Sequence, residues 1–270
     1  MRRQRESDAF NANGIEAADR KWYEEAERCF RRAIELDPGS AHAHDNLATV
    51  YSEQGKLLPA LSEYLEALKL EPENPMAHYN LAWFLSSQGP LMAIQEYQEA
   101  IRIEYDYPDA HVNLGLCYAD GGDMENAIAE FRIAMELDPS DAGAKQELAA
   151  ALIDVGEFAE AIRLLREVVR LKPEEIDGFI DLGIAYMEQG FYEEAERALK
   201  SAAKLGPAEV LPFYHLGALY ASWDRIDEAL KELTTAVSID PARVREWARA
   251  DRLFDPLRED SEFIRVLGEQ

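Results

Sequence analysis

Cysteine is scarce in this chain, and long apolar runs are missing from it. Only two cysteines, Cys29 and Cys117, occur among the 270 residues, and neither stands at a spacing that metal sites use. We therefore expect no disulfide framework, and a reducing, cytoplasmic location suits such a chain. The basic start, MRRQRESDAF, is not followed by the apolar run of a signal peptide. No stretch approaches the roughly 18 apolar residues of a membrane span, so direct membrane insertion is not expected.

Positive charge is also in short supply. The chain has 28 lysines and arginines against 53 aspartates and glutamates, which gives a formal net charge of −25 and a pI near 4.5. A field of this sign repels phosphate backbones and anionic lipid surfaces, so nucleic-acid binding is not expected and partners with basic segments are favoured. Hydrophobic residues still make up 47% of the chain, which is enough for a core and argues against global disorder.

A repeat of about 34 residues organises the sequence. Six of the prolines that follow Asp, Glu, Lys or Gly are spaced by 34, 67, 34, 34 and 34 residues, and they are Pro38, Pro72, Pro139, Pro173, Pro207 and Pro241. The interval of 67 contains one further unit, in which Tyr105 stands where the proline is expected and one residue is deleted. Seven units then tile the chain, at residues 7–40, 41–74, 75–107, 108–141, 142–175, 176–209 and 210–243.

Each unit has the pattern of two helices. The first segment carries apolar or small residues at places 4, 7, 8 and 11 of the unit, a spacing that forms one stripe on a helix and differs from the alternation of a strand. In the second unit these residues are His44, Leu47, Ala48 and Tyr51. A turn follows, and the second segment then places a bulky residue between two small ones. In the same unit these are Ala60, Tyr64 and Ala67. None of the twelve prolines falls in the middle of a predicted helix, where each would cost about 3 kcal/mol.

The period, the small and aromatic places and the closing proline resemble the tetratricopeptide repeat. The resemblance covers Ser7 to Arg243 and implies an all-α fold, a right-handed superhelical α-solenoid of stacked helix-turn-helix pairs. In that fold the first helices line a concave groove. Residues 1–6 would form an N-terminal extension. Apolar residues continue after Arg243, so residues 244–270 are expected to form capping helices over the last apolar face.

An asparagine recurs at place 6 of three consecutive units. The segments are AHDNLA (43–48), AHYNLA (77–82) and AHVNLG (110–115). At about 100° per residue, place 6 lies about 200° from place 4 and points away from the packing stripe. Asn46, Asn80 and Asn113 are therefore expected to line up on the open face of neighbouring first helices, where their amides match the donors and acceptors of a peptide backbone. The array resembles the asparagine ladder of the O-linked N-acetylglucosamine transferase family, although the next three units carry other residues at this place. The alternative is that the amides make only local contacts or meet water.

Other residues of the same open face are candidate contacts for a bound segment. The apolar candidates are Met76, Tyr79, Trp83 and Leu116, with Ile180 and Tyr214 in later units. Carboxylates, among them Asp45 and Asp109, dominate the charge of the first helices. Lys145 is the only basic residue there before the terminal turns, and it stands beside the packing stripe. The groove is therefore expected to take a basic or neutral segment, extended or helical.

No pattern of catalytic or metal-binding residues stands out. His44, His78 and His111 occupy a packing place in separate units, too far apart to bind one zinc ion at about 2.0 Å. The sequence has no Ser-His-Asp, Cys-His or glycine-rich phosphate-loop pattern in a suitable context. We therefore expect no enzymatic activity, no cofactor and no metal.

The sequence thus predicts a non-catalytic scaffold or adaptor that holds a segment of a protein partner in its concave groove. Two alternatives stay open. The chain could be the substrate-recruiting repeat portion of a larger enzyme, such as a glycosyltransferase, or a self-assembling scaffold.

Overall fold

A computed structural model describes residues 2–268, and every regular element within that range is a helix. The helices are α1 (Arg2–Asp19), α2 (Tyr23–Leu36), α3 (Ala41–Glu53), α4 (Leu57–Leu70), α5 (Pro75–Ser86), α6 (Pro90–Ile103), α7 (Pro108–Asp120), α8 (Met124–Leu137), α9 (Ala142–Asp154), α10 (Phe158–Leu171), α11 (Asp177–Glu188), α12 (Tyr192–Leu205), α13 (Val210–Ser222), α14 (Ile226–Ile239), α15 (Pro241–Ala250), the 3₁₀ helix η1 (Arg252–Leu257) and α16 (Ser261–Leu267). The predicted all-α solenoid of helix pairs is confirmed, and the pairs run from α1–α2 to α13–α14. None of these helices is both long enough and apolar enough to cross a membrane.

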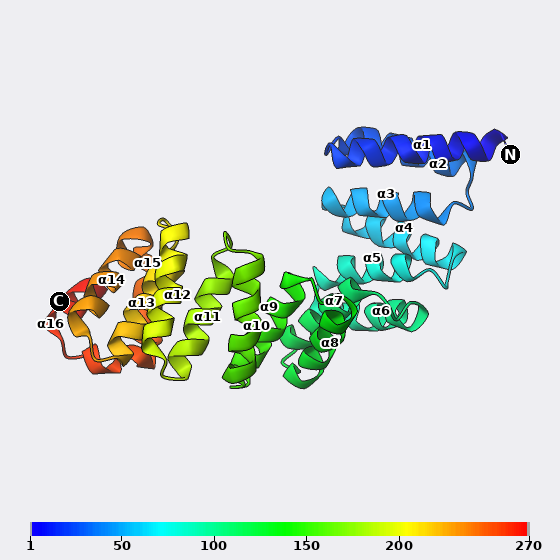
Figure 1. The fold of residues 1–270 in the computed structure, drawn as a ribbon. Helices are drawn as coiled ribbons and strands as arrows, with labels where there is room; N and C mark the ends of the chain where they lie inside the picture. The colour runs from blue at the N-terminus through cyan, green and yellow to red at the C-terminus, as the bar shows by residue number, and fades with distance from the viewer. Residues whose placement is uncertain (1, 269–270) are drawn as a thin grey trace. The chain divides into compact units, whose positions relative to one another are not determined.

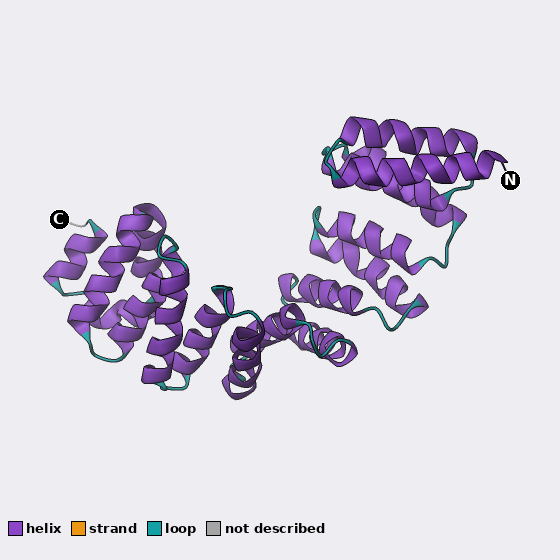
Figure 2. Cartoon of the chain, turned by 45° about the horizontal axis from the view of Figure 1, so that its top comes forward, coloured by secondary structure: helices purple, strands orange, loops and turns teal. Residues whose placement is uncertain are grey.

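The chain divides into two compact units at Pro139 and Ser140. The N-terminal unit contains α1–α8, and the C-terminal unit contains α9–α16 (Figure 1). Within each unit the helices pack in chain order: every first helix lies against its own second helix, and all but α1 and α9 also lie against the second helix of the preceding pair. Short loops join successive helices throughout (Figure 2). Each unit is therefore a stack of helix pairs with the first helices in one layer and the second helices in another.

Close packing within a pair depends on a small residue at place 8 of the first helix. A Cβ atom on Gly115 would lie 2.6 Å from the ring of Phe131 on α8, and one on Gly14 would lie 2.5 Å from the ring of Phe30. Both rings are almost fully buried. These glycines let the backbone of the first helix rest against the ring of the second, which is why the repeat pairs a small residue with a large one.

In six of the seven units the turn inside the pair has one residue in the left-handed backbone region, whereas the shorter third unit has extended backbone at Gly89, with φ 167°. Four units place a glycine there, and their φ angles are +70° at Gly55, +82° at Gly122 and Gly156, and +74° at Gly190. The first and last units use Lys21 and Asp224 instead, at φ +59° and +58°. The first and last turns therefore keep the left-handed geometry without a glycine, since other residues can adopt this conformation at some cost.

The two ends of the repeat array differ from the expected boundaries. Helix α1 begins at Arg2, so residues 2–6 of the expected extension belong to the first helix. Helix α15 begins at Pro241, three residues before the expected start of the cap, because Asp240 caps it by accepting a hydrogen bond from the Arg243 amide at 3.1 Å. The cap itself buries apolar side chains against α13 and α14. They are Val244, Ala248, Phe254, Leu257, Phe263 and Leu267.

Candidate functional site

The three asparagines join neighbouring first helices of the N-terminal unit. Asn46 on α3 donates from Nδ2 to Oδ1 of Asn11 on α1 at 3.0 Å. Asn80 on α5 donates to Oδ2 of Asp45 on α3 at 2.6 Å. Asn113 on α7 donates to the hydroxyl of Tyr79 on α5 at 2.9 Å. In each case place 6 of one unit bonds to place 5 of the unit before it, so the amides form one row of contacts between adjacent first helices.

The C-terminal unit repeats this contact with other residue types. Gln146 on α9 donates from Nε2 to Oδ2 of Asp181 on α11 at 3.2 Å, again between places 5 and 6. At the end of the array Tyr214 on α13 donates its hydroxyl hydrogen to Oδ2 of Asp251, which follows α15, at 2.8 Å. The contact between places 5 and 6 therefore recurs once within the C-terminal unit, and the contact of Tyr214 with Asp251 joins α13 to the cap.

These contacts limit the number of donors and acceptors that the three amides have left for a bound peptide. Asn113 uses both hydrogens of its Nδ2, because it also donates to the carbonyl oxygen of Asp109 at 2.9 Å. Asn46 and Asn80 each keep one amide hydrogen and their carbonyl oxygen. Each of the three amides thus donates one hydrogen to the neighbouring first helix, because the spacing of adjacent first helices lets it reach that neighbour.

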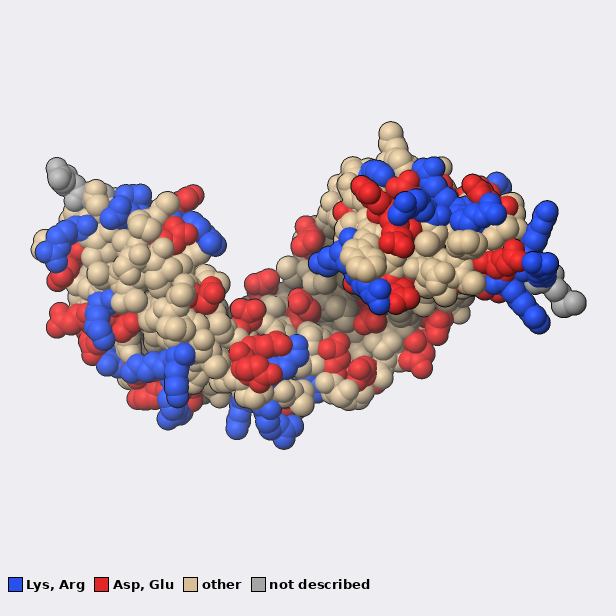
Figure 3. All heavy atoms as spheres, turned by 90° about the horizontal axis from the view of Figure 1, so that it is seen from above, with Lys and Arg blue, Asp and Glu red and all other residues tan. Residues whose placement is uncertain are grey.

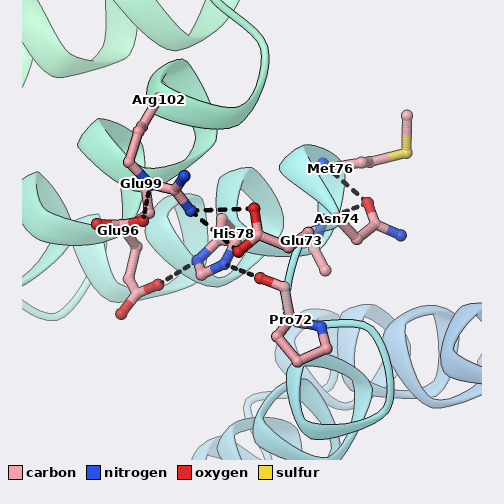
Figure 4. Close-up of polar contacts among 9 residues, drawn as sticks. Pro72, Glu73, Asn74, Met76, His78, Glu96, Glu99 and Arg102 are labelled. Atoms are coloured by element: carbon pink, nitrogen blue, oxygen red, sulfur yellow. Dashed lines mark hydrogen bonds and ion pairs between the residues drawn. The ribbon is translucent and has the colours of Figure 1, made fainter.

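Helix α5 presents the most accessible apolar side chains of the expected site. Met76 is 58% exposed and Trp83 is 46% exposed, and the two stand seven residues apart on one face of the helix. The start of α5 is held by Asn74, whose Oδ1 accepts hydrogen bonds from the amides of Met76 at 3.0 Å and Ala77 at 3.2 Å. The Met76 side chain extends away from the ionic contacts around His78 (Figure 4). This face is therefore open and fixed in position.

The remaining apolar candidates are less accessible. Tyr79 is half-buried and stacks on Tyr107 with ring centroids 5.0 Å apart, and Leu116 is also half-buried. Ile180 and Tyr214 are only 5% and 7% exposed, so their expected place on an open face is wrong. The reason for Ile180 is that α11 contacts the neighbouring first helices α9 and α13 directly. Tyr214 is covered by the cap, which reaches the first-helix layer at this end.

A hollow of about 220 Å³ lies beside Asp45, at the starts of α3 and α5. Its lining consists of Ala41, His42, Asp45, Asn74, Pro75, Met76, Ala77 and Glu104. Burial raises the pKa of Asp45 from 3.8 to about 6, although the hydrogen bond from Asn80 and the charge of His42 act in the opposite direction. Oδ1 of Asp45 is buried and accepts no hydrogen bond from the described residues. Asp109, by contrast, is exposed at the start of α7.

The three histidines at place 4 have a common role inside their helix pairs. His44, His78 and His111 each hold a glutamate of their own second helix, with Nδ1 to Oε2 distances of 2.6, 2.7 and 2.6 Å. Figure 4 shows the pair of His78 with Glu96, together with the second contact of His78 to the carbonyl oxygen of Pro72. Each histidine is thus engaged within its own pair, and the described residues contain no group of three or more metal-ligating side chains.

Lys145 takes the histidine's place in the fifth unit. Its side chain is buried and pairs with Glu167 on α10 at 2.8 Å.

The sequence analysis did not show which polar residues contact each other between neighbouring first helices. A search for polar residues spaced by 34 or 35 positions would have found Asn11 with Asn46 and Asp45 with Asn80, because that spacing is the repeat length with an offset of zero or one.

Stacked helix pairs with a shared internal pattern define a helical repeat protein. Models of the tetratricopeptide repeat match the chain along most of its length. The matched residues are 16–40 and 212–243 for one model, 29–58 for a second, 49–89 and 92–122 for a third, and 119–177 and 152–211 for a fourth. The chain belongs to the tetratricopeptide repeat family. Proteins of this family bind protein partners and the fold is typically non-catalytic, so the family supports a role as a protein–protein interaction scaffold.

Solved tetratricopeptide structures share this fold. YrrB, described as a tetratricopeptide protein with an unusual peptide-binding site, is 24% identical and has a TM-score of 0.60 over 68% of this chain and 96% of its own. The C-terminal part of a repeat protein from Cytophaga hutchinsonii is 17% identical, with a TM-score of 0.68 over 87% of this chain and 98% of its own. The Cut9–Hcn1 hetero-tetramer of the APC/C is 20% identical, with a TM-score of 0.62 over 83% of this chain and 43% of the matched chain. A comparison with curated protein sequences gives no match.

Proposed function

We propose that the N-terminal unit holds a basic or neutral segment of a protein partner against the open face of α3, α5 and α7. The observation that carries this proposal is the exposure of Met76 and Trp83 on one face of α5. Two large apolar side chains exposed on one fixed helix face form the kind of patch that a partner can cover, and tryptophan is enriched among interface anchors. YrrB, a protein of the same fold, is described as having a peptide-binding site, which agrees with this use of the fold.

The energetics favour side-chain anchors over a backbone ladder. Each neutral hydrogen bond contributes about 0.5–1.5 kcal/mol, and micromolar affinity requires about 8 kcal/mol. Asn46 and Asn80 retain too few groups to supply that energy alone. Burying a tryptophan and a methionine contributes roughly 1.5–3 kcal/mol each. In this account the amides keep the first helices in register and add secondary contacts to a guest backbone, while Trp83 and Met76 supply most of the affinity.

The preference for a basic segment follows from the hollow beside Asp45. Asp45 and Glu104 place two carboxylates on its lining, and Pro75 and Met76 add apolar surface next to them. A lysine or arginine side chain can contact both kinds of surface, because it has an aliphatic stem and a cationic end. Asp109 is exposed at the start of the adjacent first helix and can meet a further basic residue.

Replacing Trp83 with alanine should lower the affinity for a bound peptide by about 10- to 100-fold, the range expected for an interface anchor. Peptides would be selected on the wild-type protein from a random library of short sequences, labelled, and titrated by fluorescence anisotropy. Trp22→Ala is the matched control, because Trp22 is 53% exposed but precedes α2 in the turn of the first pair. Equal affinity losses in the two variants, or no loss in Trp83→Ala, would show that the open face of α5 is not the binding site.

A further inference from the structure

Basic residues recur on the second helices of two consecutive units in the C-terminal part. Places 22, 25 and 29 hold Arg163, Arg166 and Arg170 on α10, and Arg197, Lys200 and Lys204 on α12. Each residue of the first set is 34 positions before its counterpart in the second set, so the two sets occupy the same helix face in successive pairs. The other five units do not place basic residues at all three of these places. We name these six residues the outer basic surface.

The outer basic surface is exposed and only partly neutralised. All six side chains belong to exposed residues. Arg197 pairs with Glu194 at 2.8 Å, Lys200 with Glu196 at 2.6 Å, and Arg163 more loosely with Glu160 at 3.5 Å. These pairs lie within one helix and are open to solvent, where such contacts contribute little.

Three cations of this surface have no direct ionic partner. Arg166, Arg170 and Lys204 form no ion pair within 4.0 Å in the described part of the chain. The nearby carboxylate of Glu167 pairs with Lys145 at 2.8 Å, and the charges of Arg163 and Arg170 act on it only at longer range. Arg166, Arg170 and Lys204 can therefore meet carboxylates of another molecule without first losing an ion pair of their own.

The surface also has a shape that a side chain can enter. A hollow of about 460 Å³ is lined by Ala159, Ile162, Arg163, Arg166, Glu167 and Arg170, all on α10. The lining thus combines three arginines with a small apolar floor, which we define as Ile162 and Ala159. Figure 3 shows lysine and arginine side chains, with carboxylates among them, along one edge of the C-terminal unit.

We propose that the outer basic surface binds an acidic segment of a second protein partner. Arginine forms paired hydrogen bonds with carboxylates, and residues at places 22, 25 and 29 are spaced by three or four positions along one helix face. An amphipathic segment with carboxylates one turn apart and an apolar residue between them fits this spacing and the floor at Ile162. Nucleic acid is the poorer occupant, because the net charge of −25 repels a long polyanion and Glu160 and Glu167 interrupt the row of cations.

This surface differs from the proposed groove in location and in preference. The groove belongs to first helices of the N-terminal unit and takes a basic or neutral segment, whereas the outer basic surface belongs to second helices of the C-terminal unit and takes an acidic one. A single chain would then bind two partners of opposite charge at once. That is the behaviour of an adaptor, and neither site needs the other in order to bind.

The test uses a charge reversal with a matched control. Arg166→Glu/Arg170→Glu and Arg3→Glu/Arg5→Glu change the net charge equally, and Arg3 and Arg5 are exposed on α1 in the other unit. A fluorescein-labelled helical peptide with glutamates at every third or fourth position is titrated against each protein by anisotropy, and circular dichroism checks that both variants keep their helix content. We expect a loss of affinity of about tenfold or more in the first variant, a wild-type affinity in the second, and weaker binding with added salt.

Three results would overturn the proposal. Equal losses in the two variants would mean that only the total charge matters. Absence of binding of the acidic peptide to the wild-type protein at low salt would mean that the surface is merely solvated. Tighter binding of a single-stranded oligonucleotide of the same charge would assign the surface to nucleic acid instead. Trp83→Ala serves as a further control, since it should leave the affinity for the acidic peptide unchanged even if the groove proposal fails.

Discussion

Replacement of Phe254 with alanine should destabilise the C-terminal unit by about 3–5 kcal/mol. Phe254 lies in η1 and is fully buried. Its ring packs against Tyr214 at 5.6 Å and against Phe263 at 5.8 Å, and so joins the last repeat pair to both parts of the cap. Removing the ring leaves a cavity between the cap and the apolar face of α13 and α14.

The effect can be measured by urea denaturation followed through tryptophan fluorescence. Trp223 and Trp247 both pack against the C-terminal core, so their emission reports on that unit. Phe191→Ala is the control, because Phe191 is exposed in the turn before α12 and its loss should cost less than about 1 kcal/mol. A Phe254 variant as stable as the control would show that residues 241–267 are not a structural cap.

Replacement of Asp45 with asparagine should raise stability at about pH 7.5 by roughly 1–3 kcal/mol and change it little at about pH 4. The pKa of Asp45 is raised from 3.8 to about 6 by burial, so the folded state binds more protons than the unfolded state between these values. The stabilising contribution is therefore complete below pH 3.8 and is lost as the pH rises through 6. Asparagine stays neutral at every pH, and its carbonyl oxygen can still accept the hydrogen bond from Asn80.

Thermal denaturation across this pH range measures the difference. Asp181 has its pKa raised to about 6 by burial in the same way, so the Asp45 variant should keep part of the wild-type pH dependence. The control is Asp109→Asn, an equal loss of charge at an exposed position of the same unit. If both substitutions shift the melting temperature equally at each pH, the effect comes from net charge and not from the buried contact with Asn80.

The sequence was sufficient for the repeat and for the helix pairs, because both depend on local patterns. The proline spacing and the alternation of small and large residues, as in Gly115 and Phe131, recur within each unit and need no knowledge of the neighbouring unit. The angular argument directs Asn80 away from the packing stripe, and in the structure Asn80 bonds to Asp45 on the adjacent first helix.

What the sequence could not show is which groups meet between units. The row of contacts depends on the offset between adjacent first helices, which brings place 6 of one unit to place 5 of the unit before it. The same limit explains the error at Tyr214, since an open-face position becomes buried when the cap folds back onto the first-helix layer. Helical periodicity assigns a direction to a side chain, but only the stacking decides whether another helix lies in that direction.

The most direct test of the proposed binding face uses the four tryptophans of the chain as separate reporters. Each indole N–H gives one signal in a ¹H–¹⁵N spectrum, and substitution of each residue in turn assigns the four signals. Addition of a selected peptide should shift or broaden the signal of Trp83 and leave the signals of Trp22, Trp223 and Trp247 in place. A peptide that binds and moves any of those three signals while that of Trp83 stays unchanged would contradict binding at the open face of α5.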